Sequence, residues 1–96
     1  MESKAYYVEK LKATQHEIAA QLETLKGKRD ELTGEAKTEL DDKLAQLRRK
    51  RDDADRRLEE LKAAGEDSWQ DLKAATNRAY DEIADAVRSI SDRFSR

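Results

Sequence analysis

The feature that most constrains the fold of this chain is the regular spacing of its apolar residues. They recur at alternating steps of three and four, which is the heptad pattern of helices that pack along their length. One apolar seam runs from Val8 to Ala36, and after one extra four-residue step a second runs from Leu40 to Leu61. The pattern predicts helices that each carry a continuous apolar strip.

The last third of the chain follows an 11-residue repeat instead. Three columns align in it: Leu58, Trp69 and Tyr80; then Leu61, Leu72, Ile83 and Phe94; then Gly65, Thr76 and Val87. Eleven residues span three helical turns at about 3.67 residues per turn, close to the relaxed helix, so the apolar stripe runs nearly straight. The repeat predicts one amphipathic helix over most of this segment.

Composition supports long helices and argues against several classes of protein. Proline is absent and there are only three glycines, which favours helix. Charged residues make up 44% of the chain but leave a net charge of only −2, unlike the one-signed excess of nucleic-acid binders or disordered acidic tails. Cysteine is absent and His16 is the only histidine, so disulfides and metal sites built on cysteine or several histidines are not expected.

Two glycines mark the predicted helix breaks, Gly34 and Gly65. Gly65 follows a stretch that resembles a helix end, where glycine can take a left-handed conformation. The expected fold is therefore all-α: a single domain, residues 1–96, forming an antiparallel three-helix coiled-coil-like bundle. The alternative is a long two-helix hairpin, or a bent helix, that is stable only as an oligomer. The predicted helices cover about residues 3–33, 36–64 and 67–95.

An apolar strip cannot be left in water, so each one must meet another helix, another chain or a lipid surface. That requirement, rather than any motif, is the main functional inference from the residues. The candidate residues for packing and association are Val8, Leu11, Ile18, Leu22, Leu25, Leu32, Leu40, Leu44, Leu47, Leu58, Leu61, Trp69, Leu72, Tyr80, Ile83, Val87, Ile90 and Phe94.

Three polar residues, Gln15, Arg29 and Arg51, interrupt the apolar seams. Two interpretations stay open for them. Polar seam residues can fix register and oligomeric state, or they can lie at the edge of the seam with their charged or amide groups in water. His16, next to the seam, is expected to be an ordinary surface histidine.

Two other segments could bind non-protein partners. We do not expect the basic segment, residues 48–57, to bind nucleic acid, because acidic residues lie among its basic residues and no aromatic residue is near for base stacking. Trp69 and Tyr80 could anchor an amphipathic helix in a membrane surface, or pack in a helix–helix seam. Seven acidic and five basic residues lie between Glu66 and Arg96, so anionic lipid would attract this segment little.

No arrangement of residues points to catalysis. Adjacent carboxylates such as Asp41 and Asp42 point about 100° apart on a helix, whereas acid–base chemistry needs groups that converge in a cleft. We expect a non-enzyme with no cofactor, no metal and no small-molecule substrate. The first residues lack the apolar run of a secretory signal, and no apolar stretch approaches the roughly 20 residues that span a bilayer, so a cytoplasmic location is expected.

Two stretches, residues 7–13 and 60–74, carry a resemblance to a known family. They read YVEKLKA and ELKAAGEDSWQDLKA, and they resemble a family of small bacterial coiled-coil proteins described as stress-response proteins, for which no molecular activity is defined. The resemblance implies a bacterial cytosolic protein linked to stress. With the apolar seams, it gives the hypothesis of a non-enzymatic structural or interaction protein that acts by helix–helix self-association, as a homo-oligomer or with a protein partner. A peripheral membrane protein that uses the repeats of residues 58–96 is the alternative.

Overall fold

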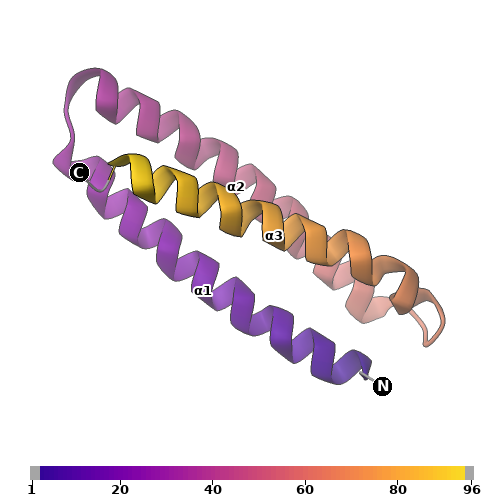
Figure 1. Ribbon diagram of the computed structural model, residues 1–96. Helices are drawn as coiled ribbons and strands as arrows, with labels where there is room; N and C mark the ends of the chain where they lie inside the picture. The colour runs from indigo at the N-terminus through magenta and orange to yellow at the C-terminus, as the bar shows by residue number, and fades with distance from the viewer. Residues whose placement is uncertain (1–2, 95–96) are drawn as a thin grey trace.

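The computed structural model describes residues 3–94, which form three antiparallel helices: α1 (Lys4–Glu31), α2 (Gly34–Ala63) and α3 (Ser68–Phe94). The bundle measures 51 × 18 × 16 Å. The first residues of α1 lie at the same end as the α2–α3 turn, and the last residues of α3 lie at the end with the α1–α2 turn (Figure 1). The all-α three-helix bundle predicted from the sequence is confirmed.

The helix boundaries differ slightly from those expected. α1 begins after Ser3, whose hydroxyl oxygen accepts a hydrogen bond from the Tyr6 backbone N–H at 3.1 Å, as an N-cap residue does. It ends at Glu31, two residues before the predicted end, and α2 begins two residues before its predicted start. The predicted end of the third helix at about residue 95 lies outside the described residues.

The α1–α2 connection consists of two residues, Leu32 and Thr33, both in extended conformation. Gly34 follows with φ +64°, and within residues 3–94 it has the only positive φ. Left-handed backbone of this kind is favourable for glycine because other residues place Cβ too close to the carbonyl oxygen. The break predicted at Gly34 is therefore real, and the glycine has a conformational reason.

The α2–α3 turn is built differently, and the left-handed conformation expected at Gly65 does not occur there. Ala64 leaves α2 in an extended conformation, with φ −72° and ψ 147°. The Gly65 carbonyl oxygen then accepts hydrogen bonds from the backbone N–H groups of Ser68 and Trp69, both at 3.1 Å. Because the chain turns through four residues here, backbone hydrogen bonds close the turn without a left-handed residue.

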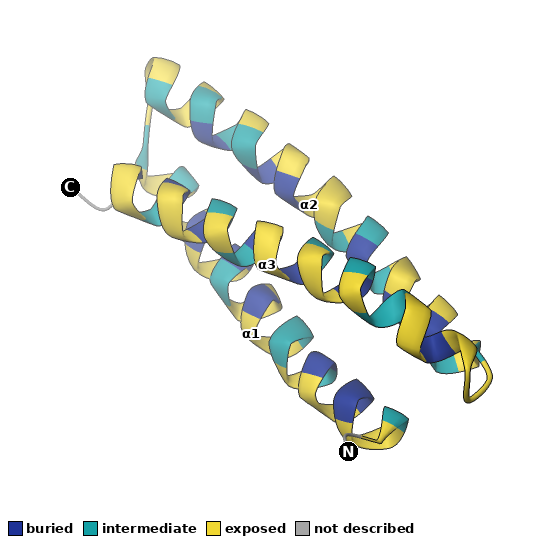
Figure 2. Ribbon diagram, turned by 45° about the vertical axis from the view of Figure 1, so that its right-hand side comes forward, coloured by how far each residue is buried: buried dark blue, intermediate teal, exposed yellow. Residues whose placement is uncertain are grey.

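The apolar strips of all three helices face one another and form a single core (Figure 2). Sixteen of the eighteen residues predicted to pack are buried, and the other two, Leu32 and Leu72, are half-buried against the core. Among the described residues, the only large apolar side chain that is mostly exposed is Tyr6, at 62%. The covering that the sequence pattern requires is thus supplied within one chain.

Candidate functional site: the surface between α1 and the α2–α3 pair

The three helices are not packed equally closely. α2 and α3 contact each other more extensively than either contacts α1. We call the contact between α1 and the other two helices the α1 surface. On α1 it is made of the buried residues Tyr7, Val8, Leu11, Ile18, Leu22 and Leu25.

At the end where α1 begins, the ring of Tyr7 contacts the ring of Trp69 in α3. The rings of Tyr7 and Trp69 lie with centroids 5.8 Å apart and planes tilted by 37°. The Tyr7 hydroxyl donates to Asn77 Oδ1 at 2.7 Å, with the Lys73 carbonyl oxygen as a second acceptor at 3.1 Å. The Lys73 ammonium nitrogen lies 5.2 Å from the Tyr7 ring centroid and 5.8 Å from that of Trp69, within range of a cation–π contact. Tilted rings and satisfied hydroxyls make this contact directional as well as apolar.

Tyr7 is not among the residues that the sequence predicts to pack, because the heptad seam begins at Val8. A signal was available: Tyr7 precedes Leu11 by four residues, so a helix places both on one face. The structure buries Tyr7 and Val8 side by side, at 2% and 8% exposure. The contact between Tyr7 and Trp69 also joins the two stretches that carry the family resemblance, which are far apart in the sequence.

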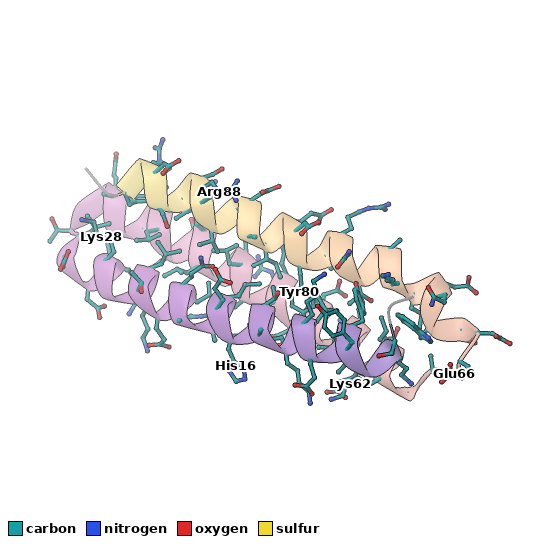
Figure 3. The ribbon with its side chains drawn as sticks, turned by 60° about the horizontal axis from the view of Figure 1, so that its bottom comes forward. His16, Lys28, Lys62, Glu66, Tyr80 and Arg88 are labelled. Atoms are coloured by element: carbon teal, nitrogen blue, oxygen red, sulfur yellow. The ribbon has the colours of Figure 1, made fainter. Side chains whose placement is uncertain are left out.

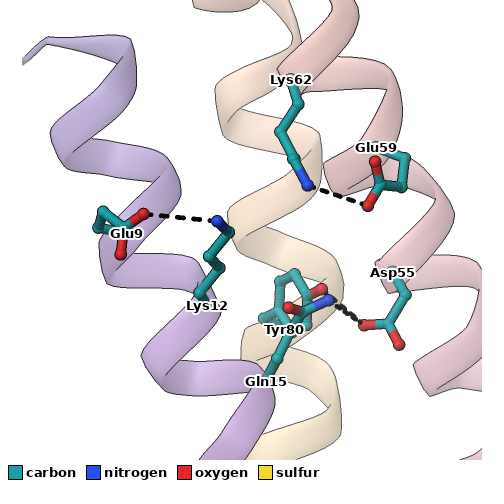
Figure 4. Close-up of polar contacts among 7 residues, drawn as sticks. All are labelled: Glu9, Lys12, Gln15, Asp55, Glu59, Lys62 and Tyr80. Atoms are coloured by element: carbon teal, nitrogen blue, oxygen red, sulfur yellow. Dashed lines mark hydrogen bonds and ion pairs between the residues drawn. The ribbon is translucent and has the colours of Figure 1, made fainter.

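About two turns further along α1, a polar junction joins all three helices (Figure 4). Gln15 of α1 donates from Nε2 to Asp55 Oδ1 of α2 at 2.8 Å, and the Tyr80 hydroxyl of α3 donates to the same oxygen at 2.8 Å. Gln15 and Asp55 are half-buried, and Tyr80 is only 2% exposed. Burial, and then the neighbouring Asp55 carboxylate, raise the pKa of Tyr80 above its ordinary value, so the phenol stays neutral and remains a donor.

This junction distinguishes the two interpretations of the polar seam residues. Gln15 bonds across helices, as a register-fixing residue does. Arg51 pairs with its exposed neighbour Asp52 on the same helix, at 3.2 Å, as an edge residue does. Arg29 combines the two: it pairs with Asp30 at 2.9 Å and reaches Asp41 of α2 at 3.3 Å.

The Arg29 guanidinium also affects the charge state of its neighbour. Its hydrogen bond to Asp30 lowers the pKa of that carboxyl below the ordinary value. The same contact raises the pKa of Arg29. Asp30 is solvent-exposed and Arg29 is half-buried, so water weakens this contact and it stabilises the end of α1 only slightly.

Beyond the junction, towards the α1–α2 turn, residues of α1 and α3 line a groove of about 380 Å³. Only Ile18 and Val87 among its lining residues are buried. The rest of the lining is mostly polar or small: Thr14, Glu17, Gln21, Thr24, Ala84, Arg88 and Ser91. In this half α1 packs through the buried side chains of Ile18, Leu22 and Leu25, whereas the ring contact and the hydrogen bonds that join Tyr7 to α3 lie at its beginning.

The other candidate residues lie away from the α1 surface or are buried in it. His16 points outward from α1, whereas Tyr80 points into the bundle (Figure 3). In the basic segment, Arg56 and Arg57 both pair with Asp53, at 3.2 and 3.0 Å. Trp69 is 2% exposed, so in this closed bundle a lipid surface cannot reach its ring.

Within residues 3–94, no group of three or more His, Asp or Glu side chains lies so that it could hold a metal ion. None of the three helices contains an apolar segment long enough to cross a membrane. Searches of protein-family models, of curated proteins and of solved structures find no match to this chain.

Proposed function

We propose that this chain is a non-enzymatic interaction protein that acts by helix–helix self-association, and that the α1 surface is where it associates. The observation that carries the proposal is that the two halves of α1 contact the rest of the bundle in different ways. Its first half adds ring contacts and hydrogen bonds to its apolar contacts, whereas its second half packs through Ile18, Leu22 and Leu25 and borders a groove. When α1 moves away from α2 and α3, its apolar face and the face that it covered both become exposed. The two faces are complementary because they pack against each other in the closed bundle.

The alternative route to self-association would be an exposed apolar patch, and the described surface offers little of one. Tyr6 is the only large apolar side chain that is mostly exposed, and it lies outside the core next to the buried Tyr7. A single ring is far smaller than the contiguous patches that mark interaction sites. This favours association through the covered strips over association through the outer surface.

The test is sedimentation velocity across a wide range of protein concentrations, read together with the fluorescence of Trp69, the single tryptophan. We expect reversible, concentration-dependent association of helical protein. Tyr6→Ala is the matched control, since it removes the exposed ring and leaves the α1 surface intact, so it should associate as the unchanged chain does. A folded chain that stays monomeric at every concentration contradicts the proposal, as does association that disappears with Tyr6→Ala.

The cellular setting that we propose is the cytoplasm of a bacterium under stress. It is supported by the family resemblance of residues 7–13 and 60–74. The test is the abundance of the protein in its own cells before and after heat, osmotic and oxidative stress. We expect a rise under at least one of the three, and constant abundance under all of them would contradict this setting.

A peripheral membrane protein is the second candidate, and α3 is the observation that favours it. α3 is the most strongly amphipathic of the three helices, and its buried face includes Trp69, Tyr80 and Phe94. Those residues would have to leave the core before they could enter a lipid surface. Flotation with vesicles of neutral and of anionic lipid tests this candidate. Co-flotation with a change in Trp69 emission would support it, and protein that stays with the soluble fraction would dismiss it.

A further inference from the structure

The connection between α1 and α2 is short enough to be absorbed into a helix. Leu32 and Thr33 are its only two residues, and the Thr33 side chain makes no capping hydrogen bond to α2. The apolar seam continues through the connection, because Leu25, Leu32 and Ala36 follow one another at steps of seven and four. If residues 32–34 became helical, these side chains would lie on one face of a single helix.

That straight form would be one helix of 60 residues, from Lys4 to Ala63, about 90 Å long. It cannot fold back on itself, so its α1 half must pack elsewhere. A second copy of the chain presents the matching surface, which is the α2–α3 pair that α1 already covers. Leu32 and Ala36, only half-buried at the end of the closed bundle, would then lie beside the same residues of the partner at the two-fold axis.

We propose that α1 is an exchangeable element: residues 32–34 straighten, and two copies of the chain each place α1 on the α2–α3 pair of the other. This rests on the proposed self-association and names its partner and its moving part. The contacts of Tyr7 with Trp69 and of Gln15 with Asp55 re-form between chains, so the core is the same in both states. The balance between them is set by residues 32–34, by the new contact at the two-fold axis and by the protein concentration.

A substitution at Gly34 can change the equilibrium between the closed monomer and the exchanged dimer without altering side-chain contacts in the core. Apart from the adjoining residues and the local backbone of α2, no described atom lies within 4 Å of the position that a Cβ would take there, so an added methyl group acts only through the backbone. Its φ of +64° is unfavourable for alanine in the closed bundle. In the straight helix alanine is more favourable than glycine. Gly34→Ala therefore disfavours the closed turn and favours the straight helix at the same time.

The expected effect of Gly34→Ala is at least about tenfold per turn, and so about 100-fold tighter dimerisation for the two turns of a dimer. Gly27→Ala is the matched control. Gly27 is exposed inside α1, has no neighbour within 4 Å of its Cβ position and does not take a positive φ. The same chemical change there stabilises α1 in both states and should leave the dimerisation constant unchanged.

A second variant acts in the opposite direction. Inserting Gly-Ser-Gly-Ser between Leu32 and Thr33 relaxes the closed turn and places two glycines in the path of the straight helix. Dimerisation should then weaken below that of the unchanged chain. Helical content by circular dichroism confirms for each variant that the bundle still forms, so loss of dimerisation is not confused with loss of folding.

A distance measurement shows whether α1 has moved. The chain has no cysteine, so Ala20→Cys and Ala45→Cys, both at exposed positions, can carry a pair of spin labels. In the closed bundle these positions lie on neighbouring antiparallel helices, whose axes are about 10 Å apart. In the straight helix they are 25 residues apart in sequence, or about 37 Å. Diluting the labelled chain in an excess of unlabelled chain leaves only distances within one chain.

The expected result is a short distance in the monomer and a distance near 37 Å in the dimer, with the long distance dominant in Gly34→Ala. A dimer with only the short distance would overturn the exchange of α1 and leave self-association standing. Unchanged dimerisation in Gly34→Ala would have the same meaning. If the unchanged chain and Gly34→Ala are both monomeric at every concentration, both proposals fail.

Discussion

The two ends of the bundle hold α1 in different ways. At the end where α1 begins, which we call the aromatic end, Tyr7 contacts Trp69 and the Tyr7 hydroxyl bonds to Asn77. At the opposite end, which we call the hinge end, α1 borders a groove and turns into α2 through two residues. Ion pairs between exposed or half-exposed groups, such as Arg93 of α3 with Glu39 of α2 at 2.8 Å, are the polar links between helices there.

The difference shows that two parts of one helix with the same apolar periodicity can make different kinds of contact with the neighbouring helices. The seam has the same spacing along α1, but the ring contact of Tyr7 lies at the aromatic end and the hydrogen bond of Gln15 at the junction, whereas near the hinge end α1 is linked to α2 by the ion pair of Arg29 with Asp41. Directional contacts specify which helix is the neighbour, whereas apolar strips alone tolerate several arrangements. Opening is thus expected to begin at the hinge end.

The largest effect is expected for Trp69→Ala. It removes a buried ring and its contact with Tyr7, which should cost about 3–5 kcal/mol of unfolding free energy. Phe94→Ala at the hinge end is the comparison, and should cost roughly half as much or less because the last turn of a helix frays. Urea unfolding followed by circular dichroism measures both. If Phe94→Ala costs as much as Trp69→Ala, the two ends are equally held and the comparison fails.

Asp55→Ala comes next, because Gln15 and Tyr80 both donate to the lost carboxylate. Leaving two donors unpaired near the core should cost about 2 kcal/mol. Asp52→Ala is the control: Asp52 is exposed and pairs only with Arg51 of its own helix, so its loss should stay within about 0.5 kcal/mol. The same unfolding measurement applies. Equal effects of the two changes would mean that the junction does not help to hold α1.

Tyr80→Phe tests the junction through pH. At neutral pH it should cost about 1 kcal/mol, the value of one hydrogen bond. Because burial raises the pKa of Tyr80, the unfolded chain loses the phenol proton first as pH rises. The contribution of Tyr80 is therefore complete below about pH 10 and decreases above it. Unfolding free energies from pH 8 to 11 should fall less steeply in Tyr80→Phe than in the unchanged chain. Tyr6→Phe, at an exposed position, should leave the slope unchanged.

The smallest effect is expected for Arg93→Ala at the hinge end. Its ion pair with Glu39 is exposed, so its loss should cost at most about 0.5 kcal/mol and should become undetectable at high salt. Unfolding in low and high sodium chloride measures this. A cost well above that of the junction variants would show that charge, rather than rings and hydrogen bonds, holds the bundle together.

The sequence predicted the helices and most of the core because both depend on local spacing. Residues such as Leu22 and Ile83 recur on one face of a helix whatever lies opposite, so their burial follows from the periodicity alone. Leu32 and Leu72 fit the same spacing but are only half-buried. Periodicity does not indicate how far the neighbouring helix extends, and so could not distinguish them.

The candidate site could be predicted less well, because its partners are distant in the sequence. Asp55 lies among basic and acidic residues that fit a solvated face, and nothing local indicates that Gln15, 40 residues away, donates to it. Tyr7 and Asn77 are separated by 70 residues. The left-handed turn was assigned to Gly65 because a helix-ending pattern precedes it, but Gly34 adopts it. The two-residue connection before Gly34 leaves little other conformational choice.

The sequence by itself determined that this chain is helical, where its apolar strips lie and that those strips must be covered, because helix propensity and spacing act within a few residues. Tertiary packing was needed for the rest: it shows that one chain covers all of these apolar strips and that the ring contact and hydrogen bonds of Tyr7 lie at the aromatic end. It also shows that Gly34 takes the left-handed conformation. Those outcomes depend on groups that meet only after the helices pack, at distances along the chain over which local patterns carry no information.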